Sequence, residues 1–263
     1  MPRALLRALD VTIGRRVGGL LAGDYRSPLL GVGTELAQVR PYVPGDDVRR
    51  LDANVTARTG EPHVRVDLAE RVLVSWLVLD TSPSMRFGTA ARRKSDVAEG
   101  AAIALGHVAT RRGNRLGVVT FGDDEPQQQQ PRQGRLGLLG LLGALRHEER
   151  SAAGATSLGE ALRRAGALAR QRALVVVVSD FRGPRDWEAP LRSLRGRHGV
   201  MAVEIRDPRE QQLTPMGDLW MVDPETGRQV QVNTSRRRVR ERFAAAAAED
   251  RGEVAAALAR AGA

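Results

Sequence analysis

Long apolar runs alternate with amphipathic segments in the second half of the chain, and this alternation predicts its secondary structure. The residues from Val72 to Leu79, interrupted by Ser75, and those from Leu174 to Val178 are typical of strands buried on both faces. Further strands are expected over 116–121 and 200–205. Helices are expected over 90–112, 136–145 and 186–197, and a further helix is expected to begin after an N-cap at Ser157. The apolar face of the first of these helices is expected to hold Val97, Ala101, Ala104 and Val108. Strands and helices in this order predict a doubly wound, mostly parallel Rossmann-like α/β sheet.

The segments around this region follow other patterns. An edge strand is predicted at His63–Val66, a hairpin over 221–232 and a tight turn at Pro44–Asp47. In that turn, side-chain hydrogen bonds explain Asp46 and Asp47 better than a metal site does. The predicted divisions are an N-terminal segment, an α/β domain and an Arg- and Ala-rich C-terminal helix, at residues 1–70, 71–235 and 236–263.

The composition narrows the possible functions. The chain has 263 residues and no cysteine, which excludes disulfides, a thiol nucleophile and Cys-ligated zinc. No apolar run approaches the roughly 20 residues of a membrane span, so we expect no span and a cytoplasmic location. The formal charge of +10 permits nucleic-acid binding, but aromatic residues make up only 3% of the chain, and Lys94 is the sole lysine among many arginines. An acidic protein partner explains the charge equally well.

Polar side chains follow the two most apolar strands. Asp80, Ser82 and Ser84 come at the end of the first strand, and Asp180 comes directly after the later one. Thr156 lies just before the capped helix start. In a doubly wound sheet the carboxyl ends of neighbouring strands share one crevice, so these five side chains are expected to converge there. Their hard oxygen donors predict a site for Mg²⁺, or alternatively Mn²⁺.

The same residues do not form a recognisable catalytic set. A phosphatase of the aspartyl-phosphate kind needs a second Asp two positions after the first, and that position is Ser82. The four histidines show neither triad nor metal-ligand spacing, and no Walker A motif is present. We therefore predict no catalytic residue and no organic cofactor. A turn that merely caps the next helix remains an alternative for the Asp80–Ser84 stretch, and a metal-dependent hydrolase remains an alternative function.

The order of the five residues resembles a known metal site. Asp80-x-Ser82-x-Ser84, then Thr156, then Asp180, is similar to the metal-ion-dependent adhesion site (MIDAS) of von Willebrand factor A domains. The similar stretch covers about residues 71–233. This resemblance implies a Rossmann-like fold, a Mg²⁺ held directly or through water, and a protein partner that supplies an Asp or Glu to the ion.

The N-terminal segment resembles one family in particular. Arg40–Arg49, followed by Asp52, is similar to the signature of the family called domain of unknown function 58. A Trp usually follows this Asp in the family, whereas Ala53 stands here. The resemblance implies a functional link with AAA+ ATPases of the MoxR type in the assembly or activation of protein complexes. Together these patterns predict a non-enzymatic, metal-dependent protein-interaction module.

Overall fold

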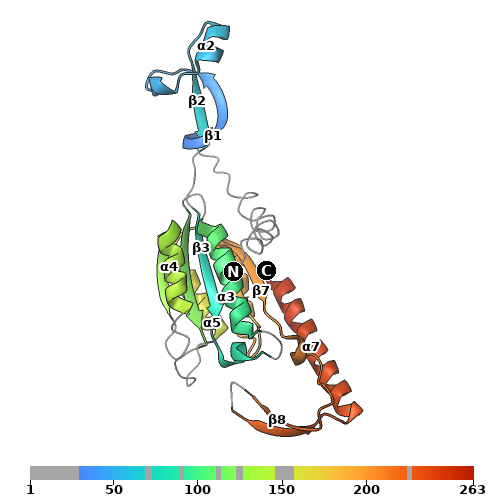
Figure 1. The fold of residues 1–263 in the computed structure, drawn as a ribbon. Coiled ribbons are helices and arrows are strands. Elements are labelled where there is room, and N and C mark those ends of the chain that lie inside the picture. The colour runs from blue at the N-terminus through green and yellow to red at the C-terminus, as the bar shows by residue number, and fades with distance from the viewer. Residues whose placement is uncertain are drawn as a thin grey trace. The chain divides into compact units, whose positions relative to one another are not determined.

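The computed structural model describes residues 30–68, 73–88, 92–110, 114–122, 127–145, 157–223 and 227–263. These residues belong to two compact units, and each is considered by itself. The larger unit contains all described residues from 73 onward, and the smaller one contains residues 30–68 (Figure 1). The predicted helical pattern at Leu5, Leu9 and Ile13 lies outside the described residues.

A five-stranded sheet forms the centre of the larger unit. In spatial order its strands are β5 (Gln128–Gln133), β4 (Arg115–Phe121), β3 (Val74–Asp80), β6 (Leu174–Ser179) and β7 (Gly199–Glu204). All neighbours run parallel except β5, which pairs antiparallel with β4 at the edge. Every residue of β3 and β6 is buried, as their continuous apolar sequences predicted. The expected mostly parallel α/β fold is confirmed.

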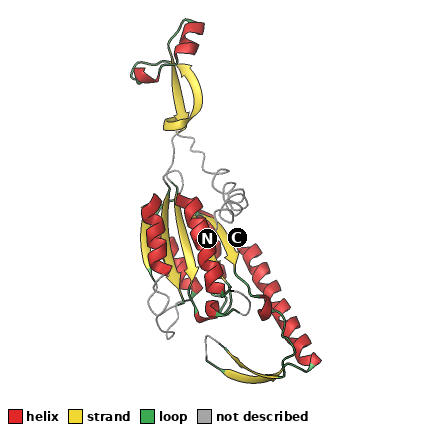
Figure 2. Cartoon of the chain, in the orientation of Figure 1, coloured by secondary structure: helices red, strands yellow, loops and turns green. Residues whose placement is uncertain are grey.

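Helices cover both faces of this sheet (Figure 2). They are α3 (Lys94–Thr110), α4 (Gly134–Leu145), α5 (Leu158–Leu168), α6 (Glu188–Arg197) and α7 (Arg237–Ala261). Helices α3 and α4 pack on each other, and α5, α6 and α7 form a second layer in which α6 contacts both of its neighbours. The core beneath this second layer includes the fully buried indoles of Trp76 and Trp187. No helix within the described ranges is long and apolar enough to span a membrane.

Helix α3 differs from its prediction in start and orientation. It begins at Lys94 instead of residue 90. Of the predicted apolar face Ala104 is buried, but Val97 is 44% exposed, and the helix also buries Ala98, Ala102 and Leu105. Ala and Gly occur on every side of this helix, so its sequence does not define one apolar face. At the start of the helix, the Lys94 N–H donates a hydrogen bond to the Phe87 carbonyl at 2.9 Å.

A β-hairpin follows the sheet in the larger unit. Strand β8 (Asp218–Val222) pairs antiparallel with β9 (Gln229–Asn233), in agreement with the predicted hairpin. Leu219 and Met221 of β8 are partly buried, while Trp220 between them is 66% exposed. Alternate residues of β8 therefore face the body of the unit.

The smaller unit is built on an antiparallel pair of strands. Strand β1 (Leu30–Pro41) pairs with β2 (His63–Leu68), and the short helix α2 (Ala53–Thr59) lies between them in sequence. The Asp46 carboxylate accepts two hydrogen bonds of 2.7 Å from the Arg40 guanidinium and one of 2.8 Å from the Val43 N–H. The structural role predicted for this turn residue is thereby confirmed. Strand β1 was not predicted, because its glycines obscure the alternating pattern.

Candidate metal centre

Two carboxylates lie at the same edge of the sheet. Asp80 is the last residue of β3, and Asp180 follows directly after β6. These strands are parallel neighbours, and the chain continues from β3 to β4 on one side but from β6 to β7 on the other. Such a reversal leaves a crevice outside the carboxyl ends of the strands, where open α/β sheets bind ligands. The topology thus brings together two residues that are far apart in the sequence.

Two hydroxyls from the loop after β3 join this pair. Ser82 precedes the 3-10 turn η2 (Pro83–Arg86), and Ser84 lies within it. The Ser84 Oγ donates a hydrogen bond to Asp180 Oδ2 at 2.9 Å and lies 3.0 Å from the Ser82 Oγ. The Ser82 N–H donates to Asp80 Oδ1 at 3.0 Å. Asp80, Ser82, Ser84 and Asp180, all predicted from the sequence, therefore form one hydrogen-bonded cluster.

The fifth predicted residue, Thr156, lies outside the described residues. The next residue, Ser157, is the N-cap of α5, and its Oγ accepts a hydrogen bond from the Glu160 N–H at 3.1 Å. The helix start predicted at this point is confirmed. Ser157 lines the same cleft as Asp80.

Ser179 is a member of the cluster that sequence reasoning missed. Its Oγ donates a hydrogen bond of 2.5 Å to Asp80 Oδ2 and accepts one of 2.9 Å from the Phe181 N–H. Its position, directly before Asp180 at the end of a buried strand, was a usable signal. Ser179 therefore ties the end of β6 to the end of β3.

Lys94, at the start of α3, was also missed. Its Nζ lies 2.7 Å from Asp180 Oδ2 and 2.7 Å from Glu210 Oε1, and its side chain is 1% exposed. A buried ammonium needs such partners, because transfer from water to the interior is costly for an unpaired charge. The sole lysine of an arginine-rich chain thus supplies an internal positive charge beside the carboxylate pair, and its rarity was the available signal.

The close approach of two buried carboxylates changes the titration of Asp80. Burial, and after it the charge of Asp180, raises the pKa of Asp80 to about 7. The donors are carboxylates and hydroxyls, which are hard oxygen ligands that suit Mg²⁺ or Mn²⁺. In the part of the chain that the structure describes, no three His, Asp or Glu side chains gather as a metal cluster. An ion here would therefore depend on the carboxylates and hydroxyls together, and the residues fit that role.

Backbone conformations around the cluster are unusual and closely packed. Phe181 has a φ of 55°, which is rare for a residue other than glycine, and its side chain is buried edge-on against Trp187. Gly122, at the end of β4, has a φ of 96°, and a Cβ placed there would lie only 2.5 Å from the Ser82 nitrogen. The Phe181 conformation is of a kind commonly found at functional sites. At position 122 a side chain would clash with the Ser82 backbone, so this position requires glycine.

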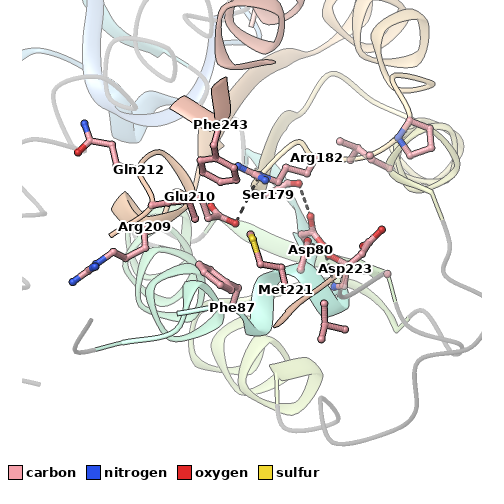
Figure 3. A pocket seen from close by; sticks show the side chains of 18 of the residues that line it. Asp80, Phe87, Ser179, Arg182, Arg209, Glu210, Gln212, Met221, Asp223 and Phe243 are labelled. Atoms are coloured by element: carbon pink, nitrogen blue, oxygen red, sulfur yellow. Dashed lines mark hydrogen bonds and ion pairs between the residues drawn. The ribbon is translucent and has the colours of Figure 1, made fainter. Parts of the chain in front are cut away.

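Asp80, Ser82, Ser84 and Ser179 line a cleft of about 1090 Å³, whereas Asp180 is buried behind them and is not among the lining residues. Figure 3 shows Asp80 and Ser179 at one side of this space and the side chains of Phe87, Met221 and Phe243 around it. These three apolar residues come from the loop after η2, from β8 and from α7. The cleft therefore joins a polar centre to apolar walls supplied by separate elements.

The sequence also matches known proteins. Residues 38–253 match the family model described as protein of unknown function DUF58. The chain belongs to the DUF58 family. Its resemblance to that family at Arg40–Arg49 is thereby confirmed. This DUF58 chain is 38% identical to an uncharacterized protein of Mycobacterium tuberculosis over 259 residues, which are 96% of this chain and 80% of that protein.

Solved structures with a similar arrangement have low sequence identity to this DUF58 chain. The conserved hypothetical protein BatB from Bacteroides thetaiotaomicron has a TM-score of 0.44 and 12% identity, and the match covers 72% of this chain and 98% of BatB. The von Willebrand factor A domain of SpRpn10 has a TM-score of 0.39 and 17% identity, and the match covers 51% of this chain and 75% of that domain.

Proposed function

We propose that this DUF58 chain is a non-enzymatic protein-interaction module that binds a partner through a metal ion. The observation that carries the proposal is the cluster of Asp80, Ser82, Ser84 and Asp180 at the switch point of the sheet. In this cluster the Lys94 ammonium is shared between Asp180 and Glu210, and Asp80 lies beside the pair without a cation of its own among the described residues. A divalent ion would supply the further positive charge that two neighbouring carboxylates attract.

Asp80, Ser82, Ser84, Thr156 and Asp180 are the residues that would hold Mg²⁺ or Mn²⁺. The ion supplies an electron-poor centre with a coordination position that a partner's Asp or Glu can occupy. Hydroxyl ligands contribute no negative charge. The carboxylates of Asp80 and Asp180 therefore at most balance the two positive charges of the ion, which can still attract a third carboxylate from the partner. Lys94 lowers the negative charge of the pair further, because it already contacts Asp180. The partner's carboxylate therefore has a favourable place to bind.

The sequence argues against one class of enzyme, because Ser82 occupies the position of the second Asp of aspartyl phosphatases. No histidine is among the described residues that line the cleft, so a hydrolase would need one of the lining carboxylates, such as Asp80 or Asp186, as its general acid or base. The hydrolase therefore stays the alternative that experiment must separate from a binding module. We propose a MoxR-type AAA+ ATPase as the partner system, because the DUF58 resemblance implies that link.

Calorimetric titration of Mg²⁺ and Mn²⁺ into the wild-type chain and into Asp80→Ala tests the metal site. We expect the wild type to bind one ion and Asp80→Ala to lose that binding while its circular dichroism spectrum is unchanged. Asp218→Ala, which alters an exposed carboxylate at the start of β8, is the matched control and should bind as the wild type does. Unchanged metal affinity in Asp80→Ala would reject the proposed centre.

Two further measurements separate the alternatives. Binding of a purified MoxR-type ATPase from the same host should require Mg²⁺ and should be lost in chelator and in Asp80→Ala. A screen with phosphate and carboxylate esters addresses the hydrolase alternative. Mg²⁺-dependent turnover that disappears in Asp80→Ala would assign an enzyme instead of a binding module.

A further inference from the structure

We infer that the apolar walls of the cleft select a partner segment in which a large apolar residue directly adjoins the metal-binding Asp or Glu. This inference rests on the proposed function and specifies the partner's chemistry. The occupant is an extended segment of another protein. Its carboxylate would lie at the Asp80 cluster, and its neighbouring side chain would lie against the hairpin and α7.

Large apolar side chains that are only partly buried form the walls of the cleft. Phe87 is 38% exposed, and Met221 and Phe243 are only partly buried. Figure 3 shows the side chains of Phe87, Met221 and Phe243 around the same space. Leu213, Met216 and Leu219 extend this lining. Large apolar side chains that converge on an open cleft from three elements are typical of a ligand site.

The size of the cleft exceeds what a carboxylate needs. Ligand pockets are commonly about 300–1,000 Å³, and this cleft of about 1090 Å³ has room for several residues of a bound segment. A single acidic side chain would leave the apolar walls in contact with water. A neighbouring Phe or Leu would cover them, and burying a side chain of that size is worth about a tenfold or greater gain in affinity.

The charges that line the cleft explain why an acidic occupant would need the ion. The described lining includes four carboxylates, of Asp80, Asp186, Glu210 and Asp223, and two guanidinium groups, of Arg182 and Arg209. This surplus of negative charge repels an acidic segment. A divalent cation at Asp80 cancels the surplus, so the anionic segment binds only to the loaded site, while Arg182 and Arg209 add local attraction.

Blocked tripeptides of defined sequence are suitable probes. With the full chain in Mg²⁺, the dissociation constants of acetyl-Gly-Asp-Gly-amide, acetyl-Gly-Asp-Phe-amide and acetyl-Gly-Asn-Phe-amide are measured by NMR titration. We expect the Asp-Phe peptide to bind at least about tenfold more tightly than the Asp-Gly peptide. The Asn-Phe peptide should bind weakly, and chelator should remove binding of both acidic peptides.

Two variants of the hairpin locate the apolar contact. Met221→Ser should reduce the Asp-Phe peptide to the affinity of the Asp-Gly peptide without changing Mg²⁺ affinity. Val230→Ser is the matched control, since Val230 pairs with Met221 across the hairpin but is 45% exposed and is not part of the described cleft lining. It should retain the preference for Phe.

The outcomes distinguish this inference from the function on which it rests. Equal wild-type affinities for the Asp-Phe and Asp-Gly peptides would overturn the inference and leave the metal-dependent module intact, and this comparison requires no variant to fold. Tight binding of the Asn-Phe peptide, or self-association of the chain that Met221→Ser abolishes, would also overturn it. Failure of every acidic peptide to bind in Mg²⁺ would count against the proposed function itself.

Discussion

The buried side chain of Lys94 connects the predicted metal centre to the rest of the larger unit. Its ammonium group joins Asp180 to Glu210, and Glu210 lies in the short turn η4 (Pro208–Glu210) that borders the cleft. Because the lysine is buried, its removal would leave two carboxylates without their shared cation. The residue therefore links the stability of the larger unit to the charge of the metal centre.

Lys94→Met should destabilise the chain and increase its response to metal. We expect the free energy of unfolding to fall by about 3 kcal/mol or more, because one partner of a buried ionic group is lost. Mg²⁺ should then raise the melting temperature more than it does in the wild type, since the ion meets a more negative site. Urea denaturation and melting curves with and without Mg²⁺ measure both effects.

Arg93→Met provides the control for this substitution. Arg93 is the exposed neighbour of Lys94, so its replacement changes net charge and shape by similar amounts without altering the buried contacts. It should leave the free energy of unfolding within about 0.5 kcal/mol of the wild type. A Lys94→Met variant as stable as this control would show that the buried pairing contributes little.

His198 gives the chain a pH-dependent stability away from the metal centre. Its Nδ1 accepts a hydrogen bond from the Ala173 N–H at 3.3 Å. Burial, followed by the charges of Arg197 and Arg172, lowers the pKa of His198 below its usual value. The unfolded chain therefore takes up this proton at a higher pH than the folded chain, and the associated stability is complete above about pH 6.5.

The free energy of unfolding should accordingly lose this contribution as the pH falls through about 6.5 toward the lower folded pKa. His198→Asn keeps an acceptor for Ala173 but has no titrating group, so its stability should fall less between pH 8 and pH 5. Urea denaturation of the wild type and of His198→Asn is compared over this pH range, and the difference in the free energy of unfolding gives the contribution of His198 alone. The comparison removes the effect of carboxylates such as Asp80, whose raised pKa makes the folded state more stable as the pH falls. Parallel curves would contradict the expectation.

At the level of elements, the strands and the site were predictable for the same reason. Strands buried on both faces have continuous apolar sequences, and polar residues at their carboxyl ends stand out against them, as at Asp80 and Asp180. The face of α3 was not predictable, because alanine and glycine occur all around it. Lys94 and Glu210 escaped detection because their meeting depends on tertiary packing between α3 and a distant turn.

The C-terminal helix, whose docking the sequence left open, packs on the larger unit. Val254, Ala257 and Ala261 of α7 are buried, and Arg185 forms ion pairs with Asp250 at 2.9 Å and with Glu253 at 3.0 Å. The small alanine side chains permit a close approach to α6, which α7 contacts. The helix is therefore part of the core of the unit, and through Phe243 it also supplies a wall of the cleft.

Ala257→Asp tests this packing. A carboxylate at a fully buried position lacks a partner, so the variant should lose about 3 kcal/mol or more of stability. Ala256→Asp introduces the same group at the adjacent exposed position and should change stability by about 0.5 kcal/mol or less. Equilibrium urea denaturation compares the two variants, and equal losses would be inconsistent with a docked helix.

At the scale of the whole molecule, the described residues of the site all come from the larger unit. Asp80, Ser82, Ser84, Asp180 and Lys94 lie in the part of the chain from residue 73 onward. The family match nevertheless begins at residue 38 and so includes much of the smaller unit. The family match therefore spans residues of both units, although the described site residues belong to one.

A chain restricted to residues 73–263 should fold and should bind Mg²⁺ with an affinity within about twofold of the full chain. The reason is that this unit has its own core and contains every predicted ligand. Circular dichroism and calorimetry check the two halves of the expectation. A folded fragment with much weaker metal binding would indicate that the smaller unit contributes to the site.

The burial of the sole lysine has a practical consequence. A lysine-directed protease has a single peptide bond to cut in this chain, next to residue 94. The enzyme can reach it only when the start of α3 opens, because the lysine side chain is inaccessible in the folded state. The rate of digestion at that position would therefore measure how often the start of α3 opens and exposes Lys94. Added Mg²⁺ should slow the digestion if the ion stabilises the folded start of the helix.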